Sequence, residues 1–208
     1  MKTAEITVTS SGKGVNEALA QTEKLGMECG LKSKEILRLR LLAEELFGMA
    51  KNIVGEIEAC YYAKADNRRF EINISSDVDM TKEMKKQLIS VSSGNGNTAS
   101  AGFMGKLKDM IGTALLPKDA GANLWSSFSL GLMGVASNSS PAAQAAAADA
   151  YYWSMQNYKK AVDSKRSDDE AAKQAWDELE KSIIANIADE ITVCIKGTNV
   201  KISVQKQF

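Results

Sequence analysis

Acidic and amide side chains occur on successive turns of an apolar stretch, residues 43–52, with the sequence AEELFGMAKN. Glu44, Glu45 and Asn52 supply oxygen atoms, which are the ligands that a hard cation such as Mg²⁺ takes in proteins. Two interpretations follow from this pattern. The stretch is either a helix at a site for a hard cation such as Mg²⁺, or the solvated face of an ordinary amphipathic helix.

The composition limits the chemistry that the chain can perform. The sequence contains no histidine, which excludes histidine acid–base catalysis and most transition-metal sites. A Mg²⁺ site built from carboxylates and phosphates remains open. The three cysteines, Cys29, Cys60 and Cys194, lie far apart and form no C-x-x-C motif, so we expect reduced thiols.

Charge and hydropathy predict a cytoplasmic protein with one domain, residues 1–208. Basic and acidic residues number 26 each, so no net charge attracts nucleic acid or an anionic membrane, although a local basic patch remains open. The N-terminus lacks the apolar core of a signal peptide, and no apolar run approaches the roughly 20 residues of a membrane-spanning helix. We therefore expect neither nucleic acid nor membrane as a partner.

Hydrophobic periodicity predicts an alternation of strands and helices. The expected elements, in chain order, are a strand at 4–10, a helix at 15–29 ended by Gly30, a helix from Ser33 to about 59, a hairpin at 60–76, a short helix at 79–90, a helix at 168–189 and a hairpin at 190–208. The two hairpin turns contain the residues expected for tight turns, ADNRR in the first and GTN in the second.

A block of different composition, residues 92–170, separates these two halves and is predicted to be a mostly helical insertion. Residues 92–140 are rich in Gly, Ser and Met, and an Ala-rich helix is expected at 141–163. Such Met-rich surfaces can repack around different protein partners; a helix lying on a membrane and a helical subdomain are the alternatives. An aromatic run could stack a nucleic-acid base but has the spacing of a helical core: Tyr151, Tyr152, Trp153 and Tyr158.

The order of expected elements resembles that of the histidine-kinase-like ATPases, the family shared by gyrase, heat-shock protein 90, sensor kinases and MutL. Residues 39–56, LRLLAEELFGMAKNIVGE, are similar to the family's E-x-x-x-N helix, and residues 179–208 are similar to its last helix and terminal hairpin. The anti-sigma-factor serine kinases are the branch it resembles most. The resemblance covers roughly the first 90 and last 35 residues, and implies a two-layer α/β (α+β) sandwich with the insertion in place of the ATP lid.

The resemblance implies roles for the residues of the opening stretch. Glu45 matches the glutamate that acts as general base on the attacking water. The asparagine that binds Mg²⁺ then falls on Met49, or on Gly48 if the frame starts at Glu44, and neither side chain offers a hard oxygen. Asn52 is the remaining candidate metal ligand, displaced by about one helical turn, roughly 5 Å.

Two further nucleotide motifs are altered. Asp77 or Asp79 matches the aspartate that reads the adenine amino group, but the glycines that follow it in the family are absent; an Asx turn is the alternative role. In place of the phosphate-binding glycines near the last helix stand three acidic residues, Asp177, Glu178 and Glu180. The remaining candidate for phosphate is the glycine-rich segment 92–106, with Gly94, Gly96 and Lys106, whose alternative role is a flexible lid loop.

The altered motifs favour a degenerate ATPase-like regulatory module that binds ATP or ADP with Mg²⁺, or no nucleotide, and acts through a protein partner in a bacterial anti-sigma-like role. A homodimer is a further assembly to consider. The alternative is an active ATP-dependent protein serine kinase or ATPase with displaced Mg²⁺ ligands. A structural domain without a ligand is the third interpretation.

Overall fold

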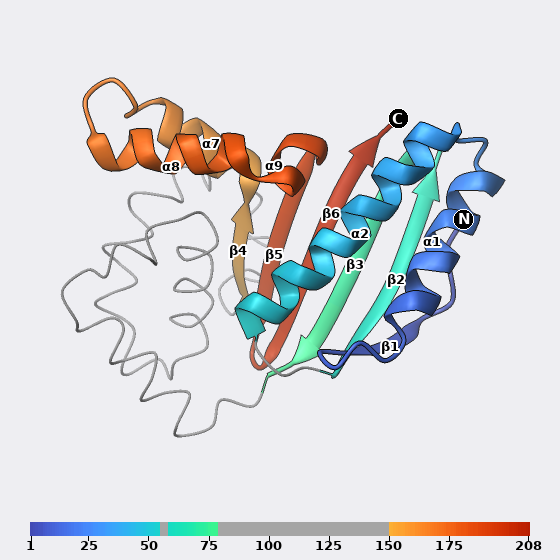
Figure 1. Cartoon of the computed structure of the whole chain (residues 1–208). Coiled ribbons are helices and arrows are strands. Elements are labelled where there is room, and N and C mark those ends of the chain that lie inside the picture. The colour runs from blue at the N-terminus through green and yellow to red at the C-terminus, as the bar shows by residue number, and fades with distance from the viewer. Residues whose placement is uncertain (55–57, 79–149) are drawn as a thin grey trace, which may run out of the picture.

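The computed structural model describes residues 1–54, 58–78 and 150–208, and the predictions for residues 79–149 lie outside this part of the chain (Figure 1). The described strands are β1 (Ile6–Thr9), β2 (Glu58–Asp66), β3 (Arg69–Asp77), β4 (Ala150–Ser154), β5 (Glu190–Lys196) and β6 (Asn199–Gln207). The described helices are α1 (Val15–Glu28), α2 (Ser33–Val54), α7 (Met155–Asp163), α8 (Glu170–Lys181) and α9 (Ile183–Ile187).

The six described strands form one antiparallel sheet in the order β1-β2-β3-β6-β5-β4. The central pairing joins β3 to β6, so the hairpin of the first half of the chain lies beside the hairpin of the second half. This pairing makes a single sheet from residues more than 120 positions apart, such as Asp77 and Asn199.

Helices α1 and α2 lie across one face of the sheet, and α9 contacts α2 on the same side (Figure 1). Alternate strand residues point into this interface and meet the apolar side of α2. The completely buried side chains here include Leu39, Leu42, Leu46, Phe70 and Ile202. The fold is therefore mixed α/β of the α+β kind, as predicted; its assignment to the histidine-kinase-like type stays a prediction.

Local sequence signals account for the first helices and for both hairpins. Helix α1 ends at Glu28, just before Gly30, which has a φ of 71°. The β2–β3 turn places Asn67 and Arg68 at φ of 43° and 66°, as a two-residue hairpin with a primed turn requires. In the β5–β6 turn, Gly197 has a φ of 60°. Both predicted hairpins are confirmed.

The helix predicted at 141–163 is wrong for residues 150–154, which form strand β4. Its residues pair with β5, Tyr152 opposite Cys194, and helix α7 begins only at Met155. The alanine-rich composition favours a helix. The open edge of β5, however, offers backbone hydrogen bonds to residues 150–154, and the aromatic side chains of this segment pack well in a sheet. Tertiary pairing overrides local propensity here.

Two predicted helix boundaries also need correction. The prediction extends the second helix to about residue 59, but β2 begins at Glu58. The helix expected at 168–189 is two helices, because the chain leaves helical geometry at Ser182. The Ser182 hydroxyl accepts a hydrogen bond from the backbone N–H of Ala185 and so caps the start of α9. The sequence did not indicate this break, because no glycine or proline stands between the two helices.

Candidate functional site

Glu44, on the exposed side of α2, is part of an ion-pair network between the first two helices. Arg40 Nε donates to Glu44 Oε1 at 2.8 Å, and Arg40 Nη1 donates to Glu23 Oε1 of α1 at 2.7 Å. The hydrogen bonds that Arg40 donates to the Glu23 and Glu44 carboxylates raise the pKa of its guanidinium. The Glu44 carboxylate therefore already has a cationic partner within its own helix.

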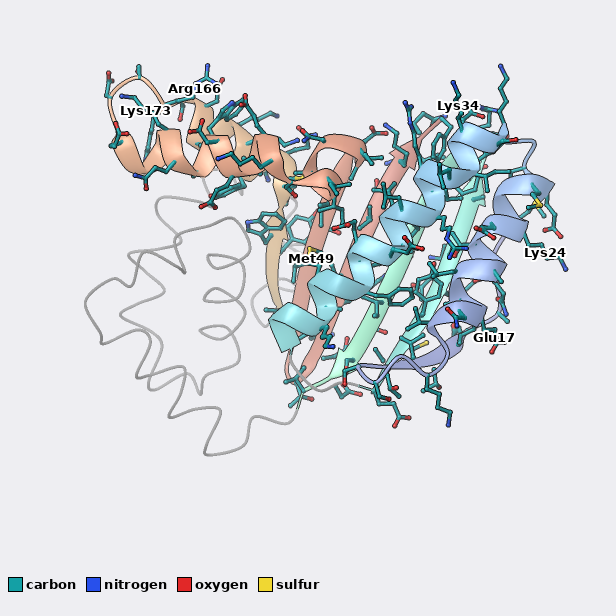
Figure 2. The ribbon with its side chains drawn as sticks, in the orientation of Figure 1. Glu17, Lys24, Lys34, Met49, Arg166 and Lys173 are labelled. Carbon is teal, nitrogen blue, oxygen red and sulfur yellow. The ribbon has the colours of Figure 1, made fainter. Side chains whose placement is uncertain are left out.

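The positions that the resemblance assigns to the Mg²⁺ ligand hold no oxygen-bearing side chain. Met49, labelled in Figure 2, is only 3% exposed and belongs to the core between α2 and the sheet. Gly48 faces open space, since an added Cβ would meet no atom within 4 Å. Glu45, on the preceding turn, is half-buried. Helix α2 thus carries the carboxylates of Glu44 and Glu45 at this level, and neither Gly48 nor Met49 on its next turn offers a hard ligand.

Several predicted site residues lie outside the part of the structure that can be described. They are the side chain of Asn52, Asp79, Gly94, Gly96 and Lys106. Among the described residues, no group of three or more Cys, Asp or Glu side chains is arranged to hold a metal ion. The predicted roles of these five residues stay predictions.

Asp77 ends strand β3 at the same edge of the molecule as the C-terminal end of α2 (Figure 1). Its Oδ1 accepts a hydrogen bond from Asn199 Nδ2 at 3.1 Å, its register partner on β6. Strand alternation groups Asp77 with Asn73 and Ser75, whose side chains lie on the sheet face away from the helices. The structure therefore brings the ends of β3 and α2 to one edge of the molecule. The Asp77 carboxylate, however, lies on the sheet face away from the helices, and Glu45 lies on a helix that covers the other face.

The acidic residues that the resemblance sets near the last helix lie in the second half of α8, Asp177, Glu178 and Glu180. One of them has a specific structural contact, because Trp176 Nε1 donates to Glu180 Oε1 at 2.7 Å. All three lie within α8 and precede α9, which begins after Ser182. Their charges are therefore not placed to interact favourably with the positive end of a helix dipole.

Sequence reasoning missed a cluster on the sheet face away from the helices. Three lysine ammonium groups surround the half-buried ring of Tyr62: Lys2 Nζ lies 4.3 Å, Lys64 Nζ 5.2 Å and Lys201 Nζ 5.8 Å from its centroid. These are cation–π distances. The signal lay in the alternation of β2, where Tyr62 and Lys64 are two residues apart, but the contribution of Lys201 required the β3–β6 pairing.

Small polar side chains lie beneath this cluster on β3 and β6. Ser203 Oγ donates to Asn73 Oδ1 at 2.7 Å, and these residues are 6% and 0% exposed. Tyr62 is the register partner of Asn73 on β2, and Lys201 on β6 must extend across β3 to reach the Tyr62 ring. The hydrogen-bonded pair gives this part of the sheet a polar interior that is satisfied internally.

Comparison of the chain with family models, with curated proteins and with solved structures gives no match. None of the helices in the described ranges is both long enough and apolar enough to span a membrane.

Proposed function

We propose that the chain is a degenerate, histidine-kinase-like regulatory module that does not hydrolyse ATP efficiently and acts by binding another protein. The observation that carries the proposal is Met49. The resemblance assigns its position to the Mg²⁺ ligand, and the side chain there is a thioether, 3% exposed, packed in the core. Mg²⁺ demands hard oxygen ligands in near-octahedral geometry, so this position does not serve it.

The contacts of the other candidate residues support the same conclusion. The Glu44 carboxylate is held by Arg40 at 2.8 Å, and the Asp77 carboxylate by Asn199 at 3.1 Å. A general base or an adenine reader would have to release or share these partners. Glu45 is the described carboxylate on α2 that remains for catalysis, and an isolated carboxylate without its metal supplies little stabilisation to a transferring phosphoryl group.

Exposed apolar side chains on the helical layer support the protein-binding part of the proposal. Leu37 of α2 is 65% exposed and Ile183 of α9 is 49% exposed. Helices α2 and α9 contact each other, so both side chains belong to the same layer of the molecule. We expect a protein partner to cover these two side chains. The proposed cellular role is anti-sigma-like regulation in a bacterial cytoplasm.

The test is a titration of ATP and of ADP by calorimetry, with and without Mg²⁺, together with an ATP-hydrolysis assay. We expect no hydrolysis above the level of Glu45→Gln, whether or not nucleotide binds. The matched control is Glu17→Gln, which removes a carboxylate from the exposed side of α1 (Figure 2). Steady Mg²⁺-dependent turnover that Glu45→Gln abolishes and Glu17→Gln retains would overturn the proposal in favour of the kinase or ATPase alternative.

Introducing the missing ligand tests the argument from Met49 directly. Met49→Asn buries an amide in an apolar site, so we expect a loss of roughly 2–4 kcal/mol in the free energy of unfolding. Because the neighbouring motifs are also altered, we expect no gain in ATP hydrolysis. Measurement of urea unfolding beside the hydrolysis assay separates a variant that is inactive from one that is unfolded.

A further inference from the structure

We draw no further inference here: the strongest candidate, the exposed apolar side chains Leu37 of α2 and Ile183 of α9 on the outer side of the helical layer, belongs to the surface already assigned to a protein partner, and nothing in the structure shows what covers it.

Discussion

The buried hydroxyl of Tyr61 provides the sharpest test of the packing between α1 and the sheet. Tyr61 of β2 is 0% exposed, and its hydroxyl lies 2.5 Å from Thr22 Oγ1, which itself donates to the carbonyl of Ala18 at 2.8 Å. The phenol is therefore the donor to Thr22. Burial raises the pKa of Tyr61 from 10.0 to about 12.

The raised pKa makes the stability of the fold fall at alkaline pH. Above pH 10 the unfolded chain loses the tyrosine proton while the folded chain keeps it. The unfolded state then binds fewer protons than the folded state, and rising pH stabilises it relative to the folded state. The contribution of Tyr61 is fully present below pH 10 and is lost as pH rises toward the folded pKa of about 12. With these two values, linkage gives a loss of about 1.4 kcal/mol between pH 8 and pH 11, and ~2.7 kcal/mol in full.

The comparison of wild type with Tyr61→Phe isolates this term from the titration of lysines. At about pH 8 we expect the variant to be less stable by ~1 kcal/mol, the contribution of one hydrogen bond. At about pH 11 the difference should vanish or reverse, since phenylalanine has no proton to lose. Urea unfolding followed by tryptophan fluorescence measures both. A difference that stays constant from pH 8 to pH 11 would refute the assignment of Tyr61 as a buried, protonated donor.

Two further predictions concern the turns. Gly14 has a φ of 77°, and an added Cβ would lie 2.2 Å from the backbone oxygen of Thr7, whereas one at Gly30, with a φ of 71°, would meet no atom within 4 Å. We expect Gly14→Ala to cost ~3 kcal/mol and Gly30→Ala ~1 kcal/mol in urea unfolding; equal costs would contradict the close approach. Arg68, in the β2–β3 turn, donates to Glu35 at 2.7 Å, and both side chains are partly exposed. Arg68→Ala should cost ~1 kcal/mol and Arg68→Lys less, and an unchanged unfolding midpoint for Arg68→Ala would show that solvent already screens this pair.

The elements that could be predicted from the amino-acid sequence are those whose signals are local. Apolar spacing and the glycine at position 30 define α1, because a left-handed residue ends a helix wherever that helix packs. The two hairpins follow from short polar turns, Asn67–Arg68 and the turn at Gly197, between alternating segments. The absence of histidine likewise restricts the available chemistry, because composition does not depend on how the chain folds.

Long-range packing, by contrast, settles which strands are neighbours and which side chains meet. Residues 150–154 are a strand because they pair with the edge of β5. The local sequence, which follows an alanine-rich stretch, does not indicate this pairing. Met49 is a core residue because α2 lies on the sheet. The helical spacing of the sequence alone was also compatible with Met49 at the position of a lost metal ligand. Lys201 reaches Tyr62 because β6 pairs with β3, a contact between residues 139 apart in sequence that only the packing of the two hairpins creates.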